Sequence, residues 1–271
     1  MHKLLKMGAL VVVMITMATA AIADGTKSRL EEIKERGYLI VGVTSEAPPF
    51  GFIDDKNELV GYEIDVAKLI AKAFFKDENK IEFVKQSFSA RWSNIDTGKI
   101  DFGIQVTTVY PERLLRVAFT RPYINSGTAV VVRKADGIST IADLNKDGIR
   151  AGLITNPQQE ERRKRYFPKT TPVTFDGWTP MLLGLRANRV DLIQMDLPQA
   201  QWFAATSDDL LVLPGLISEP TYNAIFSKHG DFPLWLALDQ LVASMRGGPL
   251  YAEYTAIFKK WFGVEPERVS P

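Results

Sequence analysis

The sequence predicts an α/β protein made of two similar units with a cleft between them. In the first half, short apolar runs alternate with amphipathic segments at helical spacing, an order typical of parallel strands joined by crossover helices. The same alternation starts again in the second half, and no low-complexity linker separates the halves. We therefore expect two extended segments, near residues 129–133 and 223–227, to join the units as a hinge around a ligand cleft.

The first unit opens with a helix whose start and end are both marked in the sequence. Ser28 and Glu31 have the spacing of a capping box, and Gly37 suits the left-handed position that closes a helix. Apolar periodicity predicts the elements that follow. They are strands at residues 38–43, 80–85 and 100–106 and helices at residues 61–75 and 91–97.

The second unit repeats the pattern. Asn156-Pro157 favours a helix start because Asn is a good cap and Pro suits the first helical position. Two final helices, at residues 233–245 and 250–262, are expected to pack back on the first unit. We expect the first unit to comprise residues 24–130 and 226–271 and the second residues 131–225. The other elements expected are strands at 128–133, 149–154, 172–175 and 190–195 and helices at 179–187 and 198–206.

Residues 1–23 differ from the rest of the chain. Lys3 and Lys6 precede an apolar run at residues 8–20, and Ala21-Ile22-Ala23 matches a small-residue cleavage pattern. These features predict a secretory signal peptide cleaved near Ala23, too short for a comfortable membrane-spanning helix. An uncleaved anchor is the alternative. We expect a soluble mature protein exported to a bacterial periplasm.

Composition excludes several classes of function. The 33 Lys and Arg residues nearly balance the 32 Asp and Glu residues, which argues against nucleic acid as a partner. The absence of Cys excludes thiol nucleophiles, thiolate metal sites and disulfides. His229 is the one His after residue 23 and lies in a polar turn, so a Ser-His-Asp triad is disfavoured. No nucleotide, zinc-protease or nucleophile-elbow motif occurs, and we expect no cofactor and no metal.

Residues 103–113 are suited to binding an anion. A predicted strand ends in Thr107 and Thr108, and Pro111 then opens a short helix that contains Arg113. Free backbone N–H groups, a hydroxyl and a guanidinium could converge there on one carboxylate. The alternative is that Arg113 pairs with a neighbouring acid, and these residues alone do not favour either interpretation. The charged run at residues 160–165 is interpreted as a solvated helix face.

Six motifs occur in order over nearly the whole chain after residue 23. They are PPFGF at 48–52, VGYEIDVAKLI at 60–70, GKIDF at 98–102, PER at 111–113, FTRPY at 119–123 and NRVDL at 188–192. Together they resemble the extracellular solute-binding proteins of polar amino-acid ABC transporters. This resemblance implies a type II periplasmic-binding-protein fold with two lobes, a cleft and two connecting strands. It also implies a monomer that captures a free amino acid and delivers it to a membrane permease.

The resemblance assigns roles to the two charged poles of the ligand. Arg113 matches the arginine that grips the α-carboxylate, and Thr108 matches a residue that contributes its amide and hydroxyl nearby. Val106 matches a backbone carbonyl that meets the ammonium, and Asp196 matches the acid that pairs with it. Such pairing is physically required because a zwitterion that leaves water needs both charges matched. Asp196 also suits the N-cap of the next predicted helix.

The resemblance also implies side-chain positions. Phe88 matches a pocket wall, and Arg91 matches a residue that meets the ligand side chain in binders of acidic amino acids. A surface arginine is the alternative for Arg91. Thr44 matches another side-chain position, where some of those binders carry a second arginine.

The sequence departs from the family pattern at two further places. Thr155-Asn156-Pro157 stands where family members often carry a Gly-Thr turn that opens the second-lobe helix, and the number of free amides changes because Pro157 has none. Ala47 replaces an aromatic shelf and is expected to widen the pocket. From these positions we expect a ligand with a polar or acidic side chain rather than a large aromatic one.

Two other functions stay open from the sequence. A dehydratase acting on prephenate or arogenate resembles this family and needs a positioned acid in the cleft. Glu160 and Glu161 are the candidates, although their surroundings do not match the dehydratase pattern. A sensor module would need a transmembrane helix or an output domain, and we expect neither.

Overall fold

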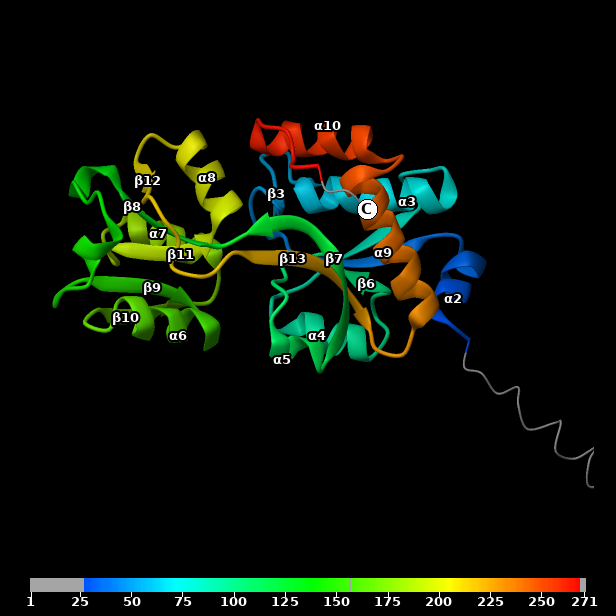
Figure 1. Cartoon of the computed structure of the whole chain (residues 1–271), viewed down its shortest axis with the longest axis horizontal. Helices are drawn as coiled ribbons and strands as arrows, with labels where there is room; N and C mark the ends of the chain where they lie inside the picture. The colour runs from blue at the N-terminus through cyan, green and yellow to red at the C-terminus, as the bar shows by residue number, and fades with distance from the viewer. Residues whose placement is uncertain (1–26, 156, 269–271) are drawn as a thin grey trace, which may run out of the picture.

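The computed structural model describes residues 27–155 and 157–268, which form two bodies side by side (Figure 1). One is built around the sheet β5-β1-β6-β13-β7 and the other around the sheet β10-β9-β11-β8-β12. We call them lobe 1 (residues 27–126 and 221–268) and lobe 2 (residues 128–155 and 157–217). The predicted two-lobed α/β architecture is confirmed. The predicted signal peptide at residues 1–23 lies outside the described residues.

The lobe 1 sheet combines parallel and antiparallel strands. β1 pairs in parallel with β5 and with β6, as the alternation of elements predicts. β13 pairs antiparallel with β6 and β7. The strand expected at residues 100–106 is shorter, because the chain leaves the sheet near Ile104 and turns toward the other lobe. The strands are β1 (Leu39–Val43), β5 (Ile81–Lys85), β6 (Phe102–Gly103), β7 (Val117–Ser126) and β13 (Thr221–Lys228).

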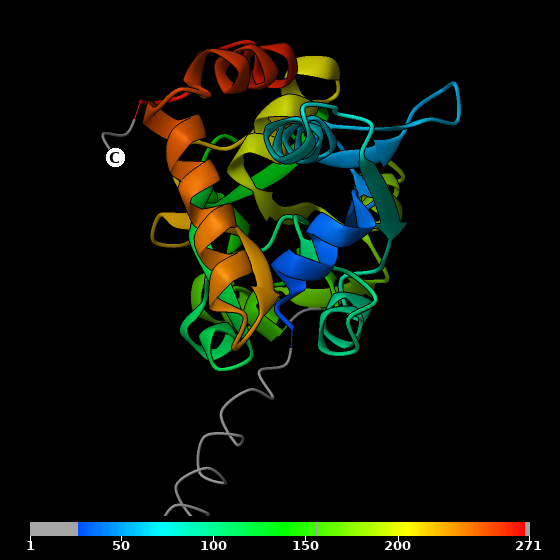
Figure 2. The ribbon, with the colours of Figure 1, turned by 90° about the vertical axis from the view of Figure 1, so that its right-hand side faces the viewer.

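The first helix of lobe 1 forms as predicted. Ser28 and Glu31 make the capping box, and Gly37 closes the helix with φ +79°. Figure 2 views lobe 1 from its outer end, where α2 and α9 face the reader and α10 lies at the top. The helices are α2 (Arg29–Arg36), α3 (Tyr62–Phe75), α4 (Ala90–Asp96), α5 (Pro111–Leu114), α9 (Phe232–Gly247) and α10 (Tyr251–Phe262), and a small sheet contains β2 (Glu46–Ala47), β3 (Gly51–Ile53) and β4 (Leu59–Val60).

Lobe 2 repeats the arrangement of lobe 1. β9 pairs in parallel with β10 and β11, and β8 pairs antiparallel with β11 and β12. Among the described residues of both lobes, no helix combines the length and the apolar character needed to cross a membrane. The strands are β8 (Thr128–Arg133), β9 (Arg150–Ile154), β10 (Thr171–Phe175), β11 (Leu192–Asp196) and β12 (Leu210–Val212), and the helices are α6 (Pro157–Tyr166), α7 (Trp178–Arg186), α8 (Leu197–Thr206) and the short 3-10 turns η1 (Lys134–Asp136) and η2 (Ile141–Leu144).

Two neighbouring segments connect the lobes. β7 and β13 pair with each other as far as Ser126 and Thr221, where both leave lobe 1 (Figure 1). On the lobe 2 side, the carbonyl of Thr128 accepts a hydrogen bond from the Ile217 N–H. Both crossings lie a few residues before the segments expected from the sequence, because those segments already pair inside the sheets.

The two C-terminal helices pack back on lobe 1, as predicted. α9 contacts β7, and α10 contacts α3 and α9. Tyr62, at the start of α3, is fully buried, and its ring centroid lies 5.1 Å from that of Phe262 and 5.8 Å from that of Phe258. Its hydroxyl is 2.9 Å from the hydroxyl of Tyr254. This aromatic cluster fixes the start of α3 beneath the cleft.

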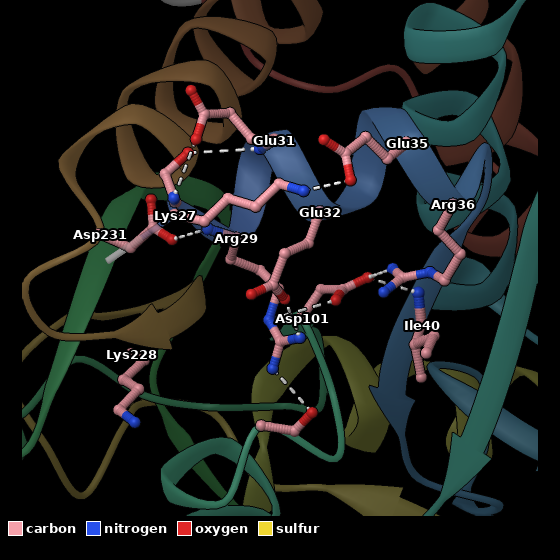
Figure 3. A network of polar contacts seen from close by, with 12 residues as sticks. Lys27, Arg29, Glu31, Glu32, Glu35, Arg36, Ile40, Asp101, Lys228 and Asp231 are labelled. Atoms are coloured by element: carbon pink, nitrogen blue, oxygen red, sulfur yellow. Dashed lines mark hydrogen bonds and ion pairs between the residues drawn. The ribbon is translucent and has the colours of Figure 1, made fainter. Parts of the chain in front are cut away.

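A charged network closes the outer end of lobe 1 (Figure 3). Asp101 is 2% exposed, accepts a hydrogen bond from the Ile40 N–H at 2.7 Å and forms an ion pair with Arg36. Arg29 lies 3.5 Å from the same carboxylate and donates to the Gly98 carbonyl at 2.7 Å. Burial raises the pKa of Asp101 despite these partners. The network ties α2 to β1 and to the loop before β6.

We predict that Asp101→Ala lowers the free energy of unfolding by about 2–4 kcal/mol, because Arg36 loses its counter-charge and the Ile40 N–H loses its acceptor. Arg29 keeps its ion pair with Glu32. Urea denaturation followed by circular dichroism measures the loss. The control is Glu253→Ala, which removes the exposed ion pair with Lys72 and should cost less than about 1 kcal/mol. Equal decreases in the free energy of unfolding in the two variants would show that the buried Asp101 stabilises the fold no more than an exposed ion pair does.

Candidate functional site: a charged cleft between the lobes

A cavity of about 390 Å³ lies between the lobes and contains most of the predicted site residues. Thr44 does not line it: it is 3% exposed, and its hydroxyl accepts from the Glu46 N–H. Ala47 is fully buried away from the cavity, so it does not widen the pocket as expected. Asn156 lies outside the described residues. The predicted residues that line the cavity are Phe88, Arg91, Val106, Thr108, Arg113 and Asp196.

Arg113 offers an unpaired positive charge on the lobe 1 side. Pro111 opens the short helix α5 as predicted, and Arg113 lies two residues inside it. Its Nη1 donates to the Thr108 carbonyl at 2.8 Å, and its guanidinium carbon lies 4.8 Å from the ring centroid of Tyr110. Within the described residues Arg113 forms no ion pair, so the alternative that it pairs with a neighbouring acid is wrong. Burial lowers its pKa.

Arg91 is a second cationic group of the cavity and is not a surface residue. It is 5% exposed, and its guanidinium carbon lies 4.4 Å from the ring centroid of Trp92. Nη1 donates to Thr107 Oγ1 at 3.0 Å and to the Gln105 carbonyl at 3.3 Å, whereas Nε has no hydrogen-bond partner. Burial, with the nearby charge of Arg113, lowers the pKa of Arg91 to about 9.

Asp196 places a carboxylate on the lobe 2 side. It is the last residue of β11 and occupies the N-cap position of α8, but its side chain makes no capping hydrogen bond. Its Oδ2 accepts from Asn223 Nδ2 at 3.3 Å. Burial raises the pKa of Asp196 to about 6, and the charges of Arg162 and Arg113 oppose that rise. The carboxylate therefore faces the cavity and not the helix end.

The loop between β6 and α5 supplies polar backbone groups. Val106 has φ +41°, which β-branched residues rarely adopt. Its N–H donates to Glu63 Oε1 at 2.6 Å, and its carbonyl accepts no hydrogen bond from the described residues. Thr108 Oγ1 donates to Asn223 Oδ1 at 3.2 Å. Asn223 thus joins Thr108 of lobe 1 to Asp196 of lobe 2.

Aromatic walls close the cavity from both lobes. Phe88 lies on the lobe 1 side, and its ring centroid is 6.5 Å from that of Trp178, which starts α7 in lobe 2. Trp178 Nε1 is buried and has no hydrogen-bond partner. The sequence analysis did not place Trp178 in the site, and it considered Thr155 only as part of a helix-opening turn, although they follow the carboxyl ends of strands β10 and β9, respectively. Ligands of open α/β sheets bind at such ends, so that rule could have found them.

The lobes also touch each other directly across the cleft. Arg162 of α6 donates to the Tyr110 hydroxyl at 2.9 Å, and Gln158 of α6 donates to Glu112 at 2.7 Å. On another side, Gln199 of α8 donates to the Pro48 carbonyl at 2.9 Å. These cross-lobe contacts describe a closed cleft.

The charged run of α6 is only partly the solvated face that we expected. Arg162 lines the cavity, and Arg163 is 7% exposed and donates to the Thr170 carbonyl at 2.9 Å. Glu160 forms an ion pair with Arg163 at 2.8 Å, which lowers the pKa of Glu160. Glu161 is exposed. Neither glutamate lines the cavity, so neither is placed as an acid for cleft chemistry.

Known proteins with similar sequences and structures share this architecture. The L-cystine-binding protein TcyJ of Escherichia coli strain K12 is 28% identical over 263 residues, which cover 96% of this chain and 95% of the relative. The ABC transporter arginine-binding protein 1 of the same strain is 29% identical over 225 residues, which cover 82% and 89%.

A solved structure is similar over most of the chain. It is that of an ancestral amino acid-binding protein described as a precursor of cyclohexadienyl dehydratase. It is 28% identical, has a TM-score of 0.78 and covers 87% of this chain and 100% of its own. The family model of bacterial extracellular solute-binding proteins, family 3, matches residues 39–264. The chain therefore belongs to the bacterial extracellular solute-binding proteins of family 3.

Proposed function

We propose that this protein is the periplasmic substrate-binding component of an amino-acid ABC transporter. It is exported with a signal peptide cleaved near Ala23, acts as a monomer, captures a free amino acid and delivers it to a membrane permease. The observation that carries the proposal is the pair of opposite charges, Arg113 and Asp196, on opposite lobes of one cavity. Relatives named for binding L-cystine and arginine support the amino-acid class.

The two poles of the cavity match the two charges of an amino acid. The α-carboxylate binds Arg113 and the Thr108 backbone N–H, and the ammonium binds Asp196 and the free carbonyl of Val106. Each charge of the ligand then recovers in the cavity the partner that it loses on leaving water. A ligand held in this way touches both lobes, so it stabilises the closed form more than the open form.

The side-chain end of the cavity is rich in donors. Three residues that line it, Arg91, Arg162 and Trp178, each have a buried side-chain N–H without a hydrogen-bond partner, namely Nε, Nε and Nε1. Buried donors left unpaired are costly, so a ligand that supplies acceptor atoms is favoured. Two of the three belong to cations. We therefore infer a polar or acidic side chain, with the acidic class favoured.

We infer binding without catalysis. A dehydratase on this fold has in its favour the likeness to the ancestral protein described as a precursor of cyclohexadienyl dehydratase. Against it, the two acids that were its candidates, Glu160 and Glu161, do not line the cavity. An assay for decarboxylation and dehydration of prephenate and arogenate separates the two functions.

We predict that Arg113→Ala and Asp196→Ala each nearly abolish the binding of L-glutamate. Either change leaves one ligand charge buried without a partner, at a cost of about 3–5 kcal/mol, or a loss in affinity on the order of a hundredfold or more. Titration calorimetry measures the affinity, and circular dichroism checks folding. The controls are Arg165→Ala and Asp208→Ala, which change exposed residues of the same charge. Affinity close to wild type in folded Asp196→Ala would refute the amino-acid assignment.

We predict that Arg91→Met changes ligand preference and not only affinity. Methionine keeps an unbranched apolar stem like that of arginine but removes the charged donors, and a hydrogen bond to a charged group contributes about 1.5–3 kcal/mol. L-glutamate should therefore lose about tenfold or more in affinity, and L-glutamine should lose less. Competition calorimetry with both ligands tests this against Arg165→Met. An unchanged ratio of the two affinities would exclude Arg91 from side-chain recognition.

A further inference from the structure

We propose that Glu63 is a positioning residue of the ligand site, which holds the Val106 peptide group so that its carbonyl binds the ligand ammonium. This inference rests on the proposed function, because it assigns Glu63 to the same site. Glu63 is the second residue of α3 and is fully buried, and it does not itself line the cavity.

One peptide group is held at both ends by charged side chains. On its N–H side, Val106 donates to Glu63 Oε1 at 2.6 Å. On its carbonyl side, Gln105 accepts from Arg91 Nη1 at 3.3 Å and from Thr107 Oγ1 at 2.8 Å. The orientation of this peptide group fixes one side of the φ rotation of Val106, and φ together with ψ sets the direction of the free Val106 carbonyl. The left-handed φ of +41° is disfavoured for valine, so the surroundings must impose it.

Glu63 also reaches the strand that leads to lobe 2. The same Oε1 accepts a hydrogen bond from the Tyr123 hydroxyl on β7, a few residues before the crossing at Ser126. Glu63 Oε2 is buried and has no hydrogen-bond partner. Within the described residues Glu63 forms no ion pair, so its carboxylate is stabilised by the hydrogen bonds from the Val106 N–H and the Tyr123 hydroxyl. The carboxylate thus links the floor of the cavity to a connecting strand.

The charge of Glu63 is coupled to the cavity above it. Burial raises its pKa to about 7; Asp196 also raises it, whereas Tyr123, Val106 and Arg91 lower it. Burial raises the pKa of the neighbouring Tyr62 hydroxyl, and the charge of Glu63 adds to that rise. A ligand ammonium placed beside Asp196 adds a positive charge and favours ionised Glu63. Binding is therefore stronger to the deprotonated form, and affinity falls as the pH decreases through about 7.

The test uses the full-length mature protein with Glu63→Gln, and with Glu78→Gln as a control at an exposed position of lobe 1. The first readout needs no ligand: the Val106 amide signal is followed by nuclear magnetic resonance as the pH is raised from about 5 to about 8.5. The second is the affinity for L-glutamate by calorimetry over the same range. A change of one unit in the pKa of Glu63 on binding corresponds to about tenfold in affinity.

We expect the Val106 signal to titrate near pH 7 in wild type and in Glu78→Gln, and not in Glu63→Gln. Above pH 7, Glu63→Gln should bind L-glutamate about tenfold more weakly. The affinity of Glu63→Gln should still fall at lower pH, as Asp196, whose pKa is about 6, becomes protonated. A folded Glu63→Gln with the affinity and pH profile of Glu78→Gln would overturn the inference. Absence of amino-acid binding by wild type would instead overturn the proposed function, whatever the Val106 signal does.

A second variant keeps the test decisive if Glu63→Gln does not fold. Tyr123→Phe removes one donor to the carboxylate with little change in volume. Because that donor lowers the pKa of Glu63, its loss should move the Val106 titration and the pH dependence of affinity to higher pH. Midpoints identical to those of wild type would overturn the inference.

Discussion

Four charged groups around one cavity have no ion-pair partner within the described residues. Glu63 and Arg91 are buried and Arg113 and Asp196 are half-buried, and desolvation is the largest cause of the pKa shift of each toward neutrality. Unpaired buried charge is unfavourable, so a fold that keeps four such groups together needs a reason. A zwitterion in the cavity supplies an anion for the two arginines and a cation for Asp196, whereas Glu63 lies behind the cavity wall.

The architecture exists to bring these groups together from distant parts of the chain. Asp196 comes from the end of β11 in lobe 2, and Arg113 from a four-residue helix in lobe 1. The chain leaves β6 early and turns into the cleft at Val106. Asn223 lies on β13, near the crossing, and hydrogen-bonds to both Thr108 and Asp196. Movement of the lobes about the crossing would therefore separate the two poles.

Many elements of the fold could be predicted from the sequence because they depend on interactions between residues close together in the chain. The capping box at Ser28, the Pro111 helix start and the alternation of strands and helices depend on neighbours in the chain, and the structure has all three. What the sequence could not provide depends on how the lobes are placed. Arg162 belongs to a run of charges, and nothing local says which side of α6 meets lobe 1. Glu63 reads as an ordinary acidic residue of a first helical turn, because its partner Val106 is 43 residues away.

Recognition of both charges of a zwitterion by the cleft is tested by titration calorimetry with three related ligands. L-glutamate carries both groups, glutarate lacks the ammonium, and 4-aminobutyrate lacks the α-carboxylate. We expect L-glutamate to bind and each analogue to bind more weakly by on the order of a hundredfold or more, because one pole of the cleft stays unpaired. Glutarate or 4-aminobutyrate binding as tightly as L-glutamate would contradict this expectation.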